Sequence, residues 1–208
     1  MLVPSVKSLI FDLGGVILDL SVDHTLTSFA DLSKMSRQKV EELYVQSTGF
    51  LEYEKGLIDD RAFRDFVRKT FSISAEDAAI DDCWNAMLRG IPAVKLELLL
   101  RLQNEFQVFL LSNTNAIHLH HINEIILPQE RHSMPLDSYF HKAYYSHRMG
   151  KRKPDAEIFE QVLEENNLLP EQTLFLDDYA VNIEGARSLG IKTIHVTSPN
   201  LILDYFHA

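Results

Sequence analysis

Short apolar runs alternate with longer amphipathic stretches along this chain, and the alternation constrains the fold more than any other feature. Runs of aliphatic and aromatic residues that stop at a polar residue are typical of strands buried on both faces, as in a parallel sheet. The runs cover residues 8–11, 106–111, 143–145, 173–176 and 193–196. They therefore predict a sheet of parallel strands.

Helical patterns separate the later runs. Residues 94–105 and 155–167 place their large apolar side chains on one side of a helix. Residues 182–189 form a third helical pattern, which stops at Gly190, a residue type that commonly ends helices. Helices and strands thus alternate from residue 92 onward, which predicts an α/β fold with a Rossmann-like parallel sheet flanked by helices.

Residues 20–90 follow a different pattern. Helical segments begin near Ser36, Asp60 and Ser74, and no strand pattern interrupts them. Asp60 is the expected cap of the second of these helices. We expect residues 20–90 to form an all-helical cap, inserted into an α/β core made of residues 1–19 and 91–208.

Composition excludes several classes of protein. The chain has 208 residues and a formal charge of −10, and such an acidic surface disfavours nucleic acid as a partner. Its one cysteine, Cys83, excludes an internal disulfide framework and fits a reducing compartment. No apolar stretch approaches the roughly 18 to 20 residues that span a membrane, and no signal sequence is evident at the N-terminus. We therefore expect a cytoplasmic protein without membrane partners.

Polar residues collect in four segments, most of them directly after a predicted strand, and we call these the polar segments. In open α/β sheets, ligands bind at the carboxyl ends of the strands. Taken alone, a polar segment of this kind is also compatible with a turn, a helix cap or a solvated basic loop. The polar segments cover residues 12–16, 112–115, 151–155 and 177–182.

The adjacent acids Asp177 and Asp178 are the most informative of these residues. Like charges after a buried strand repel each other and raise each other's pKa. A bound divalent cation removes this repulsion, and a set of oxygen ligands favours Mg²⁺. Together, the four polar segments indicate phosphoryl transfer at one edge of one sheet.

The chain resembles the haloacid dehalogenase superfamily of hydrolases. The resemblance extends in order over nearly the whole length, and the helical insertion lies where this superfamily places a C1-type cap. Within the superfamily, the chain is most similar to the bacterial sugar-phosphate phosphatases that include α-glucose-1-phosphate phosphatase. The matching motifs are Phe11-Asp12-Leu13-Gly14-Gly15-Val16, Leu111-Ser112-Asn113-Thr114, Arg152-Lys153-Pro154-Asp155, and Phe175-Leu176-Asp177-Asp178 with Asn182-Ile183-Glu184-Gly185-Ala186.

This resemblance implies a catalytic role for three residues. Asp12 would attack phosphorus and form an aspartyl-phosphate. Ser112, together with the backbone of Asn113, would bind the phosphoryl group. Lys153 would bind the phosphoryl oxygens and neutralise charge as they meet Asp12. Such a site works by positioning and charge stabilisation.

The same resemblance implies a magnesium site. Asp12 and Asp178 would be its main carboxylate ligands, with Asp177 as a second direct or water-mediated ligand. The backbone carbonyl of Gly14 would complete the protein's ligands. The implied activity is that of a Mg²⁺-dependent phosphatase that hydrolyses small phosphorylated metabolites, and the protein would be a monomer or a weak homo-oligomer.

Gly14 is a departure from many phosphatases of the superfamily, which carry an acid–base aspartate at this position. Loss of a positioned acid–base group typically removes about 10² to 10⁴ in rate. A cap residue or a water could replace it, the substrate could have a good leaving group, or the chain could bind phospho-ligands without turnover. A 2-haloacid dehalogenase also tolerates glycine here, but Asp177 and Asp178 argue against it, because dehalogenases of the superfamily act without Mg²⁺.

Two further segments contain side chains that could serve in a functional site. The run His118-Leu119-His120-His121 lacks the spacing of a metal-binding motif and predicts a solvated or capping role on a surface helix. The segment at residues 52–56 is expected to break two helices and could face the catalytic cleft.

Overall fold

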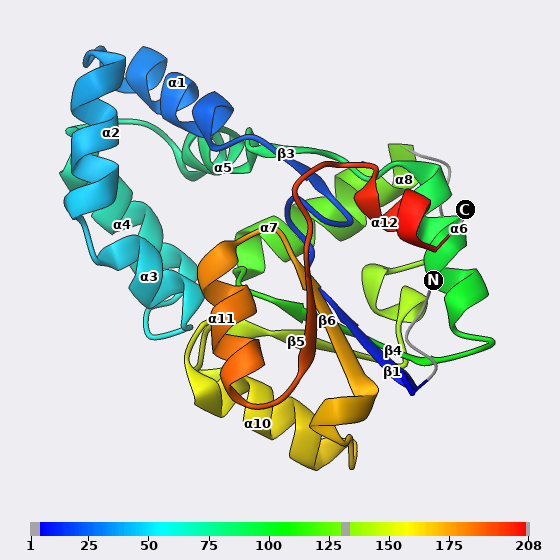
Figure 1. The fold of residues 1–208 in the computed structure, drawn as a ribbon. Coiled ribbons are helices and arrows are strands. Elements are labelled where there is room, and N and C mark those ends of the chain that lie inside the picture. The colour runs from blue at the N-terminus through cyan, green and yellow to red at the C-terminus, as the bar shows by residue number, and fades with distance from the viewer. Residues whose placement is uncertain (1–4, 130–133, 207–208) are drawn as a thin grey trace.

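The computed structural model describes residues 5–129 and 134–206, and a five-stranded parallel sheet lies at its centre. The strand order is β5-β4-β1-β6-β7 (Figure 1). The predicted α/β fold with a flanked, Rossmann-like sheet is confirmed. The strands are β1 (Ser8–Phe11), β4 (Gln107–Ser112), β5 (Lys142–Tyr145), β6 (Thr173–Asp177) and β7 (Lys192–His195).

Both faces of the sheet are covered, which explains the continuous apolar runs within its three central strands, β4, β1 and β6. Successive side chains of a strand point to opposite faces. In β1, Leu9 and Phe11 pack into one buried cluster, whereas Ile10 packs into another. Because neither face meets water, no polar residue alternates with the apolar ones in this strand.

One face of the sheet is covered by helices that precede β4, connect β4 to β5, and end the described chain. Their apolar residues share one core cluster with the strands. These elements are α6 (Ala93–Leu102), α7 (Ala116–His121), the π-helix η1 (Ile122–Ile126), α8 (Leu127–Gln129), the 3₁₀ helix η2 (Leu136–Tyr139) and α12 (Leu201–Tyr205).

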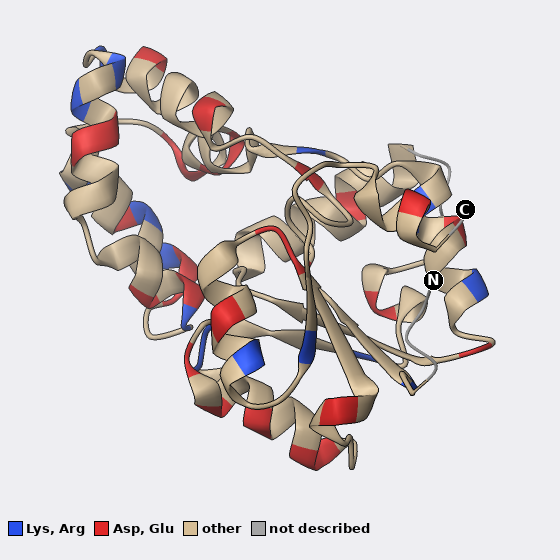
Figure 2. Cartoon of the chain, viewed as in Figure 1, with Lys and Arg blue, Asp and Glu red and all other residues tan. Residues whose placement is uncertain are grey.

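The opposite face is covered by α10 (Ala156–Glu165) and α11 (Ala180–Ser188). Short turns of helix, α9 (Ser146–Met149) and the 3₁₀ helix η3 (Pro170–Gln172), connect these helices to the strands. The charged residues of α10 are all acidic, and Figure 2 shows them along its exposed side. The negative charge counted from the sequence therefore lies partly on this outer layer.

A second group of helices lies beside the sheet, between β1 and β4 in the chain (Figure 1). These helices bury their own apolar cluster, which is separate from the two clusters of the sheet. The cap predicted at residues 20–90 corresponds to this group, although its exact limits stay a prediction. The helices are α1 (Val22–Ser33), α2 (Arg37–Gln46), α3 (Gly49–Glu54), α4 (Asp60–Phe71) and α5 (Asp77–Asn85).

Two local expectations about this region were wrong, and a third was right only in part. A short antiparallel ribbon, β2 (Asp19–Leu20) with β3 (Leu88–Gly90), joins the two ends of the insertion, and such short strands leave no periodic pattern. Asp59, and not Asp60, is the N-cap of α4, since its side chain accepts a hydrogen bond from the backbone N–H of Ala62 (2.8 Å). The expected break at residues 52–56 is partly helical, because α3 continues to Glu54.

No helix within residues 5–129 or 134–206 is long and apolar enough to cross a membrane.

The helices α1–α5 depend on an aromatic cluster around Phe63. This side chain is fully buried and stacks on Tyr53, with 4.0 Å between the ring centroids, while its ring lies 5.1 Å from that of Trp84. We predict that Phe63→Ala lowers the free energy of unfolding by about 3 to 5 kcal/mol, because a large cavity replaces these contacts. Denaturant unfolding measures the change. Val45→Ala, at a position that is 76% exposed, is the control and should stay within about 0.5 kcal/mol of the unsubstituted protein. Equal effects of the two substitutions would contradict the prediction.

Candidate active site

The first and fourth polar segments meet because β1 and β6 are neighbours in register. Phe11 pairs with Leu176, so the residues that follow, Asp12 and Asp177, leave the sheet at the same level. The backbone N–H of Asp12 donates to the carbonyl of Leu176 (2.8 Å), which continues the pairing one residue beyond the strand. Two carboxylates thereby arrive side by side at the carboxyl edge of the sheet.

The ammonium group of Lys153 lies between these two carboxylates. Its Nζ donates to Asp12 Oδ1 at 2.7 Å and to Asp177 Oδ2 at 2.6 Å, and its side chain is 1% exposed. Burial favours the neutral amine, but the two carboxylates outweigh burial and raise the pKa of Lys153, so the cation is retained. Burial also raises the pKa of Asp12, an effect that Lys153 opposes and Asp177 reinforces.

Asp177 and Asp178 have different surroundings, although they are adjacent in the chain. Asp177 is fully buried, and it accepts hydrogen bonds from the backbone N–H of Tyr179 (2.8 Å) and from Asn182 Nδ2 (3.0 and 3.1 Å) as well as from Lys153. Asp178 is exposed as a residue, but its carboxyl group is partly screened from water by its neighbours, and this partial desolvation, followed by the charge of Asp177, raises its pKa. Asp178 therefore has the freer carboxylate of the two.

The carboxylates of Asp12, Asp177 and Asp178 can together hold a cation. One oxygen of each lies within 4.8 Å of the others. Three aspartates and Lys153 give this cluster a formal charge of −3 + 1 = −2, which a divalent cation balances. An all-oxygen donor set suits Mg²⁺, so the residues present fit the ion that the sequence predicts.

The second polar segment lies at the end of β4, and its loop is fixed by hydrogen bonds. The hydroxyl of Ser146 accepts from the backbone N–H of Thr114 (2.9 Å) and donates to the carbonyl of Thr114 (3.0 Å). The side chain of Asn113 bonds the backbone of Lys153 in both directions, at 3.0 and 2.9 Å. The side-chain amide of Asn113 thus positions the loop that carries Lys153. The expected phosphate contact is made by the backbone of Asn113, not by this side chain.

A cavity of about 150 Å³ opens beside this edge, between the sheet and the helices α1–α5. Ser112, Asn113 and Gly14 line it from the sheet side, and residues of α2, α3 and α5 line it from the other side, among them Glu54 and Trp84. A phosphate ester held at the edge of the sheet would therefore place its alcohol under these helices.

Leu20 is the nearest side chain to Gly14 across the cavity. A Cβ atom at position 14 would lie 3.2 Å from Leu20 Cδ2, a close contact with the end of a flexible side chain. Leu20 and Gly14 both line the cavity.

Of two residues that line this cavity, one contradicts the sequence-based expectation and the other agrees with it. His118 was expected on a surface helix, but it is 4% exposed and lines the cavity, so that expectation was wrong; His120, two residues later, is exposed. Glu54, which the sequence placed in a segment that could face the cleft, lines the cavity and forms an ion pair with Arg152 at 3.1 Å. A run of histidines gives no signal of which side chain turns inward.

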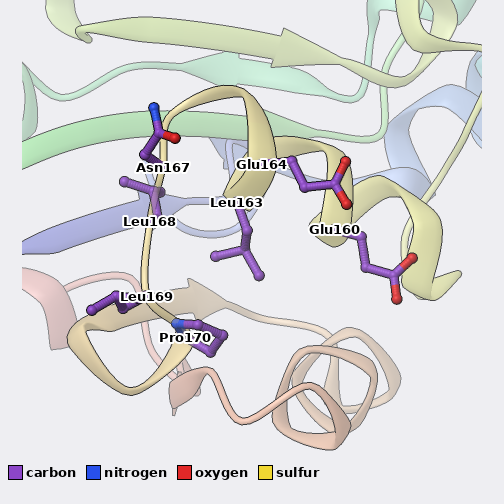
Figure 3. A pocket seen from close by; sticks show the side chains of 7 residues that line it. All are labelled: Glu160, Leu163, Glu164, Asn167, Leu168, Leu169 and Pro170. Atoms are coloured by element: carbon purple, nitrogen blue, oxygen red, sulfur yellow. The ribbon is translucent and has the colours of Figure 1, made fainter.

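Another hollow, of about 530 Å³, lies between the end of α10 and η3 (Figure 3). The chain at this hollow leads into the start of β6, and the polar segments follow strand ends at the opposite edge of the sheet. Its side chains are mainly aliphatic with acidic groups beside them, and they include none of the predicted site residues. We therefore exclude it as the active site. It is lined by Glu160, Leu163, Glu164, Asn167, Leu168, Leu169 and Pro170.

The chain is similar over most of its length to known phosphatases. The chain is 29% identical over 191 residues, 90% of each protein, to a D-ribitol-5-phosphate phosphatase of Bacteroides thetaiotaomicron. It is 26% identical to the sesquiterpene phosphatase AstK of Aspergillus oryzae, over 92% of this chain and 90% of the relative. A crystal structure of a haloacid dehalogenase family enzyme from B. thetaiotaomicron, in complex with magnesium and inorganic phosphate, superposes with a TM-score of 0.83. It is 38% identical, over 91% of this chain and 93% of that one.

A family model described as haloacid dehalogenase-like hydrolase matches residues 6–190. The match includes all four polar segments, and it confirms the resemblance inferred from their motifs. The relatives also confirm the expected likeness to bacterial sugar-phosphate phosphatases. The chain belongs to the haloacid dehalogenase-like hydrolases.

Proposed function

We propose that this protein is a Mg²⁺-dependent phosphatase that hydrolyses small phosphomonoesters, chiefly sugar and polyol phosphates. The observation that carries the proposal is the buried lysine of the active site. Lys153 bridges Asp12 and Asp177 next to the open carboxylate of Asp178. A cation and further carboxylates thus lie beside the aspartate that would accept the phosphoryl group. The names of the relatives support the substrate class, because one acts on ribitol 5-phosphate.

The reaction begins with Asp12. Its carboxylate oxygen forms a bond to phosphorus, while the bond between phosphorus and the alcohol oxygen breaks, and the alcohol leaves with a proton from water. The hydroxide left by that water then attacks phosphorus, and the bond between phosphorus and the Asp12 oxygen breaks, which returns the free carboxylate and releases inorganic phosphate. Lys153 holds Asp12 by its Oδ1 atom, which fixes the nucleophile and offsets charge as the phosphoryl oxygens approach.

Asp12, Asp178 and the Gly14 carbonyl would hold Mg²⁺, with Asp177 beside them as the buried, fully hydrogen-bonded member. The ion supplies positive charge that stabilises the transferring phosphoryl group. Ser112 and the backbone of Asn113 would bind the oxygens of that group, since they line the cavity at the carboxyl end of β4.

Two alternatives are a dehalogenase and a phospho-ligand binder without turnover. Structures of dehalogenases that resemble this chain are at most 22% identical to it, so they show the fold alone. A phospho-ligand binder without turnover remains the alternative that activity measurements must exclude, because Gly14 carries no acid–base side chain.

The first prediction concerns the nucleophile. Asp12→Asn removes the attacking oxygen charge and should lower phosphate release from ribitol 5-phosphate in the presence of Mg²⁺ by at least about a thousandfold. A chelator should abolish release by the unsubstituted protein. Asp204→Asn, at an exposed position of α12, is the control and should keep full activity. Turnover without metal, or full activity of Asp12→Asn, would contradict the proposal. Thermal stabilisation by phosphate esters without any release would favour the non-catalytic binder.

The second prediction compares two glycines that share a backbone conformation. Gly15 has φ +71° and Gly150 has φ +68°, so alanine costs about 1 to 2 kcal/mol of stability at either position. A Cβ at Gly15 would lie 2.1 Å from Asp178 Oδ2, whereas no described residue other than its chain neighbours lies within 4 Å of a Cβ at Gly150. Gly15→Ala should therefore displace Asp178 and raise the Mg²⁺ concentration for half-maximal activity by about 10- to 100-fold. Gly150→Ala should leave that concentration unchanged, and an equal response of the two variants would exclude the contact as the cause.

A further inference from the structure

His118 is a buried polar side chain with a ring nitrogen that lacks a hydrogen-bond partner in the described part of the protein. It lies in the first turn of α7, is 4% exposed and lines the same cavity as Ser112. Its Nε2 atom is buried and has no hydrogen-bond partner within residues 5–129 and 134–206. Buried nitrogen atoms are nearly always hydrogen-bonded, because an unpaired one loses its water without compensation. In a cavity beside a phosphate site, a ligand can supply the missing partner.

The ring of His118 is held in place by its neighbours. It packs edge-on against Trp84, with 4.7 Å between the ring centroids and an angle of 84° between the rings. Its backbone N–H donates to Asn115 Oδ1 (3.0 Å), and the same oxygen accepts from the indole N–H of Trp84 (3.4 Å). A side chain fixed in this way, with one nitrogen unpaired, has a preorganised binding group.

The imidazole of His118 is neutral at physiological pH. Burial lowers its pKa to about 3, and the neighbouring His121 and His147 lower it further in the same direction. A neutral imidazole offers one hydrogen-bond donor and one acceptor, and has no net charge to attract a phosphoryl group. An alcohol hydroxyl is its natural partner, since a hydroxyl can also donate and accept.

The cavity also separates the two ends of a substrate. Ser112 and Asn113 lie at the carboxyl end of β4, where the phosphoryl group is expected. His118 lies farther along the chain, in the first turn of α7 and against Trp84 of α5. Glu54 offers a second polar group on the wall formed by α3. The part of the substrate beyond the ester oxygen would therefore meet polar groups as well as apolar walls.

We propose that the imidazole of His118 hydrogen-bonds a hydroxyl group of the substrate's alcohol, so that this site selects phosphate esters of polyhydroxy alcohols over esters of hydroxyl-free alcohols. This inference rests on the proposed phosphatase function. It assigns His118 to substrate selection and leaves phosphoryl transfer to Asp12 and Lys153. Sites built to hydrogen-bond a hydroxyl discriminate strongly against analogues that lack it, because their buried polar group is then left unpaired.

The test compares kcat/KM for three esters: the best substrate among ribitol 5-phosphate and the hexose phosphates, pentyl phosphate, and 4-nitrophenyl phosphate. The unsubstituted protein should prefer the polyhydroxy ester to pentyl phosphate by at least about tenfold. His118→Leu should lower kcat/KM for the polyhydroxy ester by about five- to tenfold, and should change the value for 4-nitrophenyl phosphate by less than about twofold.

Two further variants separate recognition from packing. His118→Gln places an amide near the position of Nε2 and should restore at least half of the preference for the polyhydroxy ester. His120→Leu, an equivalent change on an exposed face of α7, should leave both values unchanged. Thermal unfolding of each variant confirms that it is folded. If His118→Leu does not fold, the preference of the unsubstituted protein together with His118→Gln decides the question.

Three results would overturn the inference. One is a preference near one between the polyhydroxy ester and pentyl phosphate in the unsubstituted protein. Another is an equal fall for all esters in His118→Leu, which indicates packing alone. The third is better turnover of a terpenyl phosphate such as farnesyl phosphate, which would mean that the apolar walls select the alcohol. In each of these cases Asp12-dependent phosphate release persists, so the proposed function survives. Absence of release from every ester would overturn both proposals.

Discussion

The contact of one ammonium group with two buried carboxylates organises this molecule. Lys153, Asp12 and Asp177 come from distant parts of the chain. The Nζ atom of Lys153 lies 2.7 Å from Asp12 Oδ1 and 2.6 Å from Asp177 Oδ2. Removing one partner of a buried ion pair typically costs about 3 to 5 kcal/mol, because the remaining charge is left without water or a counter-charge. The β1–β6 register and the clamp of Asn113 on the lysine backbone are therefore requirements of the site. In the proposed function, Lys153 and a divalent cation would together offset the three carboxylates of the site, while the outer helix α10 carries further negative charge.

The sequence predicted the core and its site because both follow from short-range patterns. Continuous apolar runs such as residues 173–176 arise only where both sides of a strand are buried, and parallel strands bring their carboxyl ends to one edge. Asp12, Ser112 and Asp177 could therefore be placed together without knowledge of any long-range contact. The charge repulsion between Asp177 and Asp178 indicated a cation for the same local reason. The difference in burial between Asp177 and Asp178 was not predictable from the sequence, because it depends on the hydrogen bonds that Lys153 and Asn182 donate to Asp177.

The wall of the cavity opposite the sheet was beyond sequence analysis. Which histidine of residues 118–121 turns inward is decided by Trp84, a residue of another helix, and neither helix carries a pattern that reports the contact. The short helix α3 was also missed, since its six residues provide less than two turns of periodicity. Its importance comes from its end, where Glu54 meets Arg152. Contacts between separate layers of a fold depend on how the layers dock, and local patterns carry little information about docking.

Arg152 and Lys153 show how the two layers are joined. These neighbours in one loop serve opposite sides: Lys153 points to the carboxylates of the sheet, and Arg152 pairs with Glu54 of α3. Burial raises the pKa of Glu54, and the charge of Arg152 opposes this, so Arg152 helps Glu54 to keep its charge beneath the helices. Covering the site also excludes water and strengthens every charge interaction beneath it. In the proposed function, the loop that carries Lys153 would thus also anchor the helices that contact the alcohol, and this shared loop would couple the selection of the alcohol to the chemistry at phosphorus.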